Sequence, residues 1–328
     1  MDHWLLILFV LIGLVFDFLN GFHDSANVVA TAIASRAVPP RWALGVNAIA
    51  NFAGPLLFGV AVATTIGNEV VTETAVTVPV ALAALIAAIF WNVLTWLLGI
   101  PSSSSHALIG GFVGAAIAGY GLEVIRIEGL IKVLVGLFIS PILGMIIGWM
   151  IMRVVLFFGQ AMTPRVSIFF QRAQWLTMIT LGLSHGSNDA QKTMGILAMG
   201  LLAFGAIPRF YVPFWVILAC AASIALGSAL GGWRLIRTMG GRFYKIRPRH
   251  ALCSQVASTA VILGAALLGG PVSSTQVISS TIVGVGAAER MPMVRWGVVG
   301  QIIMAWLLTI PATCAVGAMI FWVIHTIL

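Results

Sequence analysis

Apolar segments long enough to cross a lipid bilayer recur along the whole chain. An α-helix needs about 20 apolar residues to span the hydrocarbon core, which is roughly 30 Å thick. Of the 328 residues, 60% are hydrophobic and only 8% are charged, whereas an average soluble domain has about 25% charged residues. No soluble domain fits between the apolar segments. The chain is therefore predicted to be an all-α polytopic membrane protein, embedded in the lipid bilayer.

Polar breaks divide the chain into ten candidate membrane segments, five in each half. They lie near residues 4–34, 42–66, 79–99, 103–119 and 130–157, and near 174–206, 212–231, 251–268, 273–288 and 293–325. The first segment of each half is interrupted by glycine and polar residues, so a broken helix is expected there. No basic residue precedes the first apolar segment and no cleavage site follows it, which favours a retained span over a signal peptide.

The two halves resemble each other in sequence. GIPSSSSHALIGGFVGAAIA (99–118) aligns without gaps on GGPVSSTQVISSTIVGVGAA (269–288) at an offset of 170, with seven of the twenty positions identical. GFHDSANVVA (21–30) aligns on GSNDAQKTMG (186–195) at an offset of 165, which places Asp24 over Asp189. Two matches in the same order indicate an internal duplication.

The second half is expected to enter the membrane from the opposite side, because each half has an odd number of segments. GNEVVTETAVTV (67–78) has two Glu and no base, whereas the matching region GWRLIRTMGGRFYKIRPRH (232–250) has six Lys or Arg and no acid. Basic loops stay in the cytoplasm. We therefore expect the protein to lie in the cell (inner) membrane with a cytoplasmic loop at 232–250. Both termini are then expected on the outer side. The inverted repeats would be 1–157 and 174–328, joined by a cytoplasmic linker at 158–173, with broken helices meeting at the midplane. The same charge pattern accounts for the net charge of +8 without nucleic acid as a partner.

Four ionisable residues fall clearly inside the apolar segments. Asp17, Asp24 and Asp189 are the interior carboxylates, and Lys192 is the interior base. A charge at the bilayer centre costs about 2.5–3.5 kcal/mol on insertion scales, so these residues indicate a functional site. A structural ion pair between Asp189 and Lys192, three residues apart on a helix, is the alternative.

Polar residues beside these carboxylates can supply ligands for a cation. Asn20, His23 and Asn27 surround Asp24 in the motif NGFHDSAN, and helix breaks at membrane depth are tolerated where they line a cavity. The predicted coupling-ion residues are therefore Asp17, Asn20, His23, Asp24, Asn27 and Asp189.

Two serine clusters begin apolar segments at equivalent positions of the two halves. Ser102–Ser105 follow Pro101, and Ser273–Thr275 follow Pro271 and Val272. A helix N-terminus with free amides and hydroxyl donors can form an anion site. One such cluster alone would be read as an ordinary helix cap, but its duplication favours a binding site. Because carboxylates repel an anion unless cations or protons intervene, the motifs together predict cation-coupled anion transport.

These motifs resemble the paired signatures of the inorganic phosphate transporter (Pit/PiT) family. NGFHDSANVVAT and HGSNDAQKTMG are similar to its ion-site motifs, and GIPSSSSHALIGG and GGPVSSTQVISS to its PVSST-type segments. The resemblance covers essentially the whole chain and implies a homodimeric secondary transporter that takes up phosphate with a coupling cation, without a cofactor. It implies ion-site roles for Asp24, Asn27 and Asp189. It implies phosphate-binding hydroxyls at Ser103, Ser104, Ser273, Ser274 and Thr275, to which we add Ser105, Asn188 and Lys192 as candidates.

The chain departs from the sodium-coupled pattern of that family at two positions. Lys192 stands where the first half has Asn27, and His23 stands where asparagine is usual. Both features resemble the bacterial low-affinity Pit branch, which implies coupling to protons or uptake of a metal–phosphate complex rather than sodium symport. With such a complex, Asp24 and Asp189 would also be metal ligands. Sulfate or another oxyanion stays open as the alternative substrate.

Two other classes of protein are alternatives to a carrier. Ser102–Ser105 and His106 could suggest an intramembrane hydrolase, but the second half has Gln276 in place of the histidine, so an enzyme is not expected. A channel would differ from a carrier in lacking saturable, countertransport-sensitive uptake. Roles for His106 and His185 stay open at this point, and the three cysteines are isolated, which indicates neither a disulfide nor a metal cluster.

Overall fold

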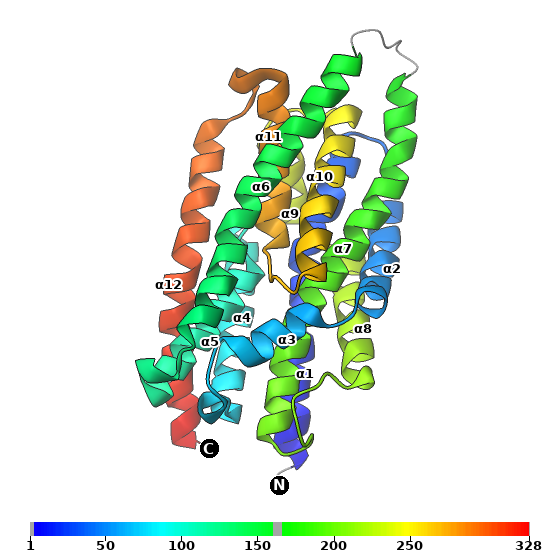
Figure 1. Cartoon of the computed structure of the whole chain (residues 1–328). Coiled ribbons are helices and arrows are strands. Elements are labelled where there is room, and N and C mark those ends of the chain that lie inside the picture. The colour runs from blue at the N-terminus through cyan, green and yellow to red at the C-terminus, as the bar shows by residue number, and fades with distance from the viewer. Residues whose placement is uncertain (1–2, 160–165, 328) are drawn as a thin grey trace.

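The computed structural model describes residues 3–159 and 166–327, which form a bundle of long, roughly parallel α-helices (Figure 1). Within these residues the only strand-type pairing is an isolated bridge between Val71 and Ile125. The helices are α1 (His3–Ala34), α2 (Pro40–Phe58), α3 (Ala61–Glu69), α4 (Val78–Leu98), α5 (Ser104–Tyr120), α6 (Ile127–Gly159), α7 (Val166–Ala203), α8 (Phe214–Leu230), α9 (Trp233–Gly241), α10 (Pro248–Leu267), α11 (Ser274–Arg290) and α12 (Trp296–Ile327).

The expected number of ten spans is not found in the described part of the chain. Five helices, α1, α4, α6, α10 and α12, are long and apolar enough to cross a membrane, and up to seven spans result if each of two bent pairs counts as one. The serine-led helices α5 and α11 have 17 residues each, or about 26 Å at 1.5 Å per residue, which is short of the bilayer core. The all-helical, membrane-type architecture is confirmed.

The short helices belong to two helical hairpins that enter the bundle from opposite ends. Tyr120 at the end of α5 lies near Thr77 before α4, and His250 at the start of α10 contacts Glu289 at the end of α11. Figure 1 shows both termini at one end of the bundle and the outer end of α10–α11 at the other. The inner turns contain Gly99 and Gly269, whose φ angles of 66° and 71° favour glycine.

The expected breaks at Asn20-Gly21 and Gly186-Asn188 are wrong, because α1 and α7 run through these positions without interruption. The glycines serve close helix packing instead. A Cβ on Gly21 would lie 2.2 Å from the carbonyl oxygen of Ile224 in α8, and one on Gly186 would lie 2.3 Å from that of Asn51 in α2. A glycine inside a helix costs about 1 kcal/mol, and close packing of helix backbones in the membrane offsets this cost.

The actual bends lie in the second helix pair of each half. The chain turns by 77° between α2 and α3, and by 70° between α8 and α9. Gly59 and Gly231 stand at these bends with φ angles of 78° and 64°. Two short helices, α3 and α9, therefore leave the direction of the long helices.

The expected loop at 232–250 is also only partly a loop, because it contains α9. This helix is amphipathic: Leu235, Ile236 and Met239 are buried, while Arg234 and Arg237 are exposed. Its apolar side packs against α1, which explains why a basic segment is helical here. The expected linker at 158–173 is shortened as well, since α6 ends at Gly159 and α7 begins at Val166; residues 160–165 lie outside the described residues.

Helices of the first half pack mainly on helices of the second. α1 packs on α8 as α7 packs on α2, and α5 packs on α12 as α11 packs on α6. Each helix of the first half corresponds to the helix numbered six higher in the second half, and exchanging the two members of every such pair reproduces the same packing. This arrangement places the middle of α1 and α7 beside the inner turns of both hairpins.

Candidate functional site

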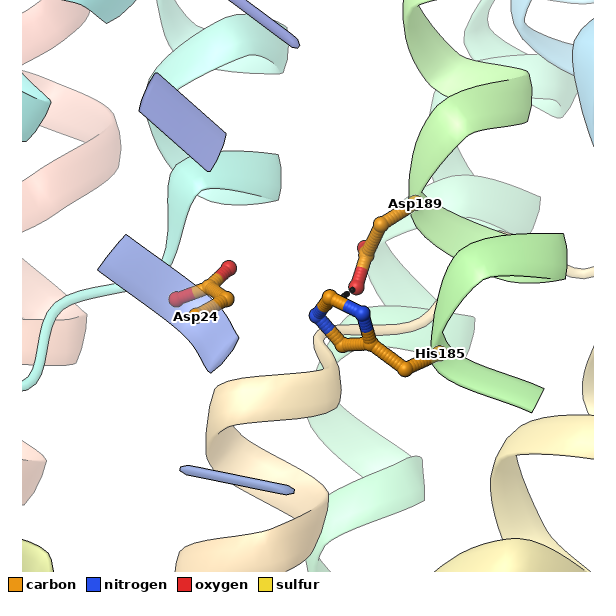
Figure 2. A group of neighbouring side chains, drawn as sticks. All are labelled: Asp24, His185 and Asp189. Atoms are coloured by element: carbon orange, nitrogen blue, oxygen red, sulfur yellow. Dashed lines mark ion pairs between the residues drawn. The ribbon is translucent and has the colours of Figure 1, made fainter. Parts of the chain in front are cut away.

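A cluster of buried polar side chains lies where α1 and α7 meet the starts of α5 and α11. Figure 2 shows Asp24 on α1 directed towards His185 and Asp189 on α7. All of the predicted interior residues in these helices are at most 2% exposed. Since buried polar groups are costly without partners, their contacts show what this cluster is built to hold.

Asp24 accepts hydrogen bonds from both hairpins. Its Oδ2 accepts from the Ser104 hydroxyl of α5 at 2.7 Å, and its Oδ1 accepts from the Thr275 hydroxyl of α11 at 2.7 Å. His23 Nδ1 lies 2.8 Å from Oδ1. Asn27 donates to the Thr275 oxygen at 2.9 Å. The carboxylate therefore joins the two serine-led helix starts.

Asp189 has the matching surroundings in the second half. Its Oδ2 accepts from the Ser274 hydroxyl of α11 at 2.5 Å, and its Oδ1 accepts from Asn188 at 3.1 Å. Lys192 forms an ion pair with Oδ1. His185 Nε2 lies 3.0 Å from Oδ2.

The contacts of the two carboxylates correspond at the offsets found in the sequence. Ser104 to Asp24 becomes Ser274 to Asp189, and the contact of Asp24 with its preceding residue His23 becomes that of Asp189 with Asn188. The contact of Asn27 with Thr275 becomes that of Lys192 with Ser105. The duplicated motifs therefore make duplicated contacts: the serine–aspartate bonds lie within each half, and the contacts of Asn27 and Lys192 join the two halves.

Lys192 is held entirely by oxygen atoms. Its ammonium donates to the Ser105 hydroxyl at 2.5 Å and to the carbonyl oxygen of Val272 at 2.7 Å, besides pairing with Asp189. A carboxylate, a hydroxyl and a backbone carbonyl are also the ligands that hard cations prefer. The ammonium thus stands in a cation-type environment, and with neutral imidazoles Asp24, Asp189 and Lys192 leave one formal negative charge.

His185, whose role the sequence leaves open, lies in the same cluster. Its Nδ1 lies 2.8 Å from Asn51 Oδ1, while the Asn51 amide nitrogen donates to Ser228. Nδ1 therefore carries the hydrogen, and the lone pair of a neutral Nε2 would face Asp189 Oδ2. A proton or a cation between these two atoms removes the repulsion. The i, i+4 spacing of His185 and Asp189 in HGSND was the signal that could have found this pair.

A metal ion fits the same cluster. Asp24, His185 and Asp189 each offer one ligand atom, and these atoms all lie within 4.8 Å of one another. Carboxylate oxygens together with an imidazole nitrogen suit divalent transition metals as well as harder cations.

The hydroxyl groups of the serine clusters divide into two kinds. Ser103 and Ser273 cap their helices, accepting from the backbone N–H groups of His106 at 3.1 Å and Gln276 at 3.4 Å. The next two residues of each cluster, Ser104, Ser105, Ser274 and Thr275, reach the carboxylates or Lys192. Capping aligns these hydroxyls with the helix N-termini, where an oxyanion is favoured.

Two predicted residues lie at the edge of the cluster. Asn20 Oδ1 lies 2.7 Å from the Ser104 hydroxyl. Asp17 lies two turns away on α1, accepts from Thr193 at 2.8 Å through Oδ1, and its buried Oδ2 has no hydrogen-bond partner among the described residues. Asp17 is therefore separate from the three-ligand group. His106 contacts its repeat equivalent, with the Gln276 amide nitrogen 3.1 Å from His106 Nδ1, on the side of α12 rather than among the carboxylates.

Comparison with known proteins gives a consistent result. The model of the phosphate transporter family matches residues 20–317. A Rhizobium meliloti (strain 1021) protein named "Probable low-affinity inorganic phosphate transporter" is 42% identical over 320 residues, covering 97% of this chain and 96% of that protein. A Bacillus subtilis (strain 168) protein of the same name is 41% identical over 327 residues, covering 98% of each. A solved structure described as "The sodium-dependent phosphate transporter" shares the fold, with a TM-score of 0.91 and 24% identity over 99% of this chain and 100% of that chain.

Proposed function

This chain belongs to the phosphate transporter family, and from that premise we propose that it imports inorganic phosphate by cation-coupled symport. The observation that carries the proposal is the meeting of Asp24 and Asp189 with hydroxyl groups from two helix starts. The helix starts supply donors for an anion. The carboxylates would repel this anion unless a cation or a proton accompanies it.

Phosphate suits this mixture of donors and acceptors. Near neutral pH it both donates and accepts hydrogen bonds, whereas sulfate only accepts. The proposed donors are Ser103, Ser104, Ser105, Asn188, Lys192, Ser273, Ser274 and Thr275. A protonated phosphate oxygen can donate a hydrogen bond to Asp24 or Asp189. The other phosphate oxygens can accept hydrogen bonds from the hydroxyl groups that bond to these carboxylates in the structure. A sulfate in the same place would face two carboxylates with nothing to donate.

For coupling, we favour protons or a metal–phosphate complex over sodium. Lys192 already neutralises Asp189 at the position equivalent to Asn27. His185 Nε2 lies 3.0 Å from Asp189 Oδ2 and has no hydrogen-bond partner among the described residues, which leaves it available to a proton or a divalent cation. The remaining proposed coupling residues are Asp17, Asn20, His23, Asp24 and Asn27. The sodium dependence named for the solved structure belongs to that protein.

The repeated contacts favour two inverted repeats, 1–157 and 174–328, with the cytoplasmic linker between them shortened to the segment between α6 and α7. In this arrangement the hairpins α4–α5 and α10–α11 would open the site alternately to the two sides. We place the protein in the cell (inner) membrane as a homodimer, with both termini outside and the basic segment 232–250 in the cytoplasm.

Phosphate selectivity is the experiment that tests this function. Proteoliposomes holding the purified protein should take up labelled phosphate in a saturable way, and equimolar sulfate should inhibit the initial rate by little. Countertransport of preloaded phosphate should accelerate uptake, which separates a carrier from a channel. Strong inhibition by equimolar sulfate would favour the sulfate or general oxyanion alternative instead.

The coupling cation is expected not to be sodium. Replacing sodium by choline at fixed pH and fixed magnesium should leave the initial rate nearly unchanged, because Lys192 occupies the second cation position. Collapse of uptake with a protonophore would indicate protons, and a strict magnesium requirement would indicate the complexed substrate. His185→Gln should weaken the dependence of uptake on the proton gradient or on magnesium, whichever is found. Glu128→Gln is the control, because Glu128 is exposed. A large loss of uptake without sodium would contradict this assignment.

A further inference from the structure

Two threonines make equivalent contacts with the inner turns of the hairpins. The hydroxyl of Thr65 in α3 lies 2.8 Å from the carbonyl oxygen of Gly269, and that of Thr238 in α9 lies 3.4 Å from the carbonyl oxygen of Gly99. Both threonines are nearly buried, at 3% and 5% exposure. Each short helix thus touches the hairpin turn of the opposite half.

These turns lead directly into the proposed phosphate site. Gly269 precedes the segment Gly270–Ser273 that brings the chain to Ser274 and Thr275, and within it the Val272 carbonyl oxygen accepts from both Lys192 and Asn188. Gly99 stands at the same place before Ser104 and Ser105. Because both glycines have a positive φ and end a helix, the direction of each turn depends on what holds its carbonyl group.

The two contacts differ in strength. Each threonine hydroxyl has one proton and a second acceptor in its own helix, which is Ala61 at 3.4 Å for Thr65 and Arg234 at 3.2 Å for Thr238. For Thr65 the glycine carbonyl is much the nearer acceptor. For Thr238 the proton is shared with its own helix. The hydrogen bond from Thr65 therefore holds the α10–α11 turn more firmly than the hydrogen bond from Thr238 holds the α4–α5 turn.

Helix α3 is in turn hydrogen-bonded to α7, the helix that carries Asp189 and Lys192. The side-chain oxygen of Gln191 in α7 lies 2.8 Å from the backbone N–H nitrogen of Val62 and 3.4 Å from that of Ala63, so it caps the N-terminus of α3 from a neighbouring helix. Gln191 lies between Asp189 and Lys192 in the sequence. Its equivalent in the first half is Ala26, which cannot cap α9. Figure 1 shows α3 lying across the long helices beside α7.

We propose that Thr65 and Thr238 are positioning residues for phosphate, and that Gln191 and α3 link the carboxylates of α7 to the serine-led start of α11. Thr65 holds the Gly269 turn so that Ser274 and Thr275 stand at the anion site, and Thr238 does the same, less firmly, for Ser104 and Ser105. Gln191 fixes the position of α3 relative to α7, and thereby the position of Thr65. The inference rests on the proposed phosphate site.

The test is a set of phosphate titrations of the full-length protein in proteoliposomes. Thr65→Val keeps the side-chain shape and removes the donor; it should raise KM for phosphate about two- to tenfold, the range of one neutral hydrogen bond, with little change in maximal rate. Thr238→Val should raise KM less. Thr65→Ser, which keeps the hydroxyl, should restore the parent value. Thr64→Val is the matched control, because the Thr64 hydroxyl is exposed and bonds the carbonyl of Val60, the residue just before α3.

A double-mutant cycle tests the link through α3. Gln191→Met should raise KM as Thr65→Val does, and the double variant should be no worse than the stronger single variant, since both act through one helix. Additive effects would overturn the link. An unchanged KM in Thr65→Val would overturn the positioning role; if that variant inserts poorly, Thr65→Cys, a weak donor, takes its place. Ser274→Ala separates the proposals: if it leaves KM unchanged, the phosphate site itself is wrong, and if it alone raises KM, only the threonine inference fails.

Discussion

Asp24→Asn and Asp189→Asn are each expected to abolish phosphate uptake while leaving the protein in the membrane at normal abundance. The two carboxylates occupy equivalent places in α1 and α7, and each accepts a hydrogen bond from a serine at a helix start. Asparagine keeps the side-chain volume but loses the charge and one acceptor oxygen. A hydrogen bond to a charged group contributes about 1.5–3 kcal/mol, and each carboxylate accepts at least two from the residues of the proposed site, so a loss of uptake of at least about 100-fold is expected.

The measurement is the initial rate of labelled phosphate uptake, normalised to the amount of inserted protein. Glu128→Gln is the matched control, because this carboxylate is exposed at the start of α6 and faces no part of the site. Asp17→Asn should have a smaller effect, since Asp17 lies outside the three-ligand group. Uptake at the parent rate in either site variant would remove that carboxylate from the mechanism.

Lys192→Met is expected to have the second largest effect. The substitution keeps an unbranched side chain of similar length but leaves Asp189 without its ammonium partner, so the site has two uncompensated carboxylates instead of one. A second uncompensated charge about 4–6 Å from an anion repels it by about 3–4 kcal/mol at an effective dielectric constant of about 20, so the anion should bind at least about 100-fold more weakly in a medium without small cations. Added sodium should restore part of the uptake, because a cation can occupy the place of the ammonium beside Ser105 and Val272.

Lys192→Asn sharpens this prediction, since it recreates the residue found at the equivalent position 27. Its amide oxygen can act as a cation ligand, so the sodium response should exceed that of Lys192→Met. Uptake is measured in sodium and in choline media at one pH. Parent-like uptake by both variants in choline would show that Lys192 has no part in coupling.

A double variant separates this role from a purely structural ion pair. Asp189→Asn with Lys192→Met removes both charges together, and a pair that only stabilises the fold would tolerate this change and keep transport. A coupling role predicts that the double variant stays inactive, because the carboxylate that binds the proton or cation is gone.

The sequence by itself determined the class of protein and predicted which polar residues lie inside the membrane segments. Composition requires a membrane, because so few charged residues cannot cover a soluble surface. The duplicated motifs pair Asp24 with Asp189 and the two serine clusters with each other, and the cost of a charge inside an apolar segment makes the two carboxylates candidates for a functional role. The contacts found between these residues follow the same offsets as the sequence match.

Only the tertiary structure decided how the helices run and what completes the site. Gly21 and Gly186 look like helix breaks in a sequence, but the close approach of α8 and α2 turns them into packing positions, because a glycine preference for helix or break depends on its neighbours. In the sequence the serine-led segments can be full or partial spans, and the structure shows helices of 17 residues, which stop short of the bilayer core. The Val272 carbonyl reaches Lys192 across 80 positions, Thr65 reaches the Gly269 turn across 204, and the orientation of His185 depends on Asn51, which lies 134 positions away. Backbone carbonyls and long-range partners carry no mark in the local sequence, so only the packing of the two halves assigns them.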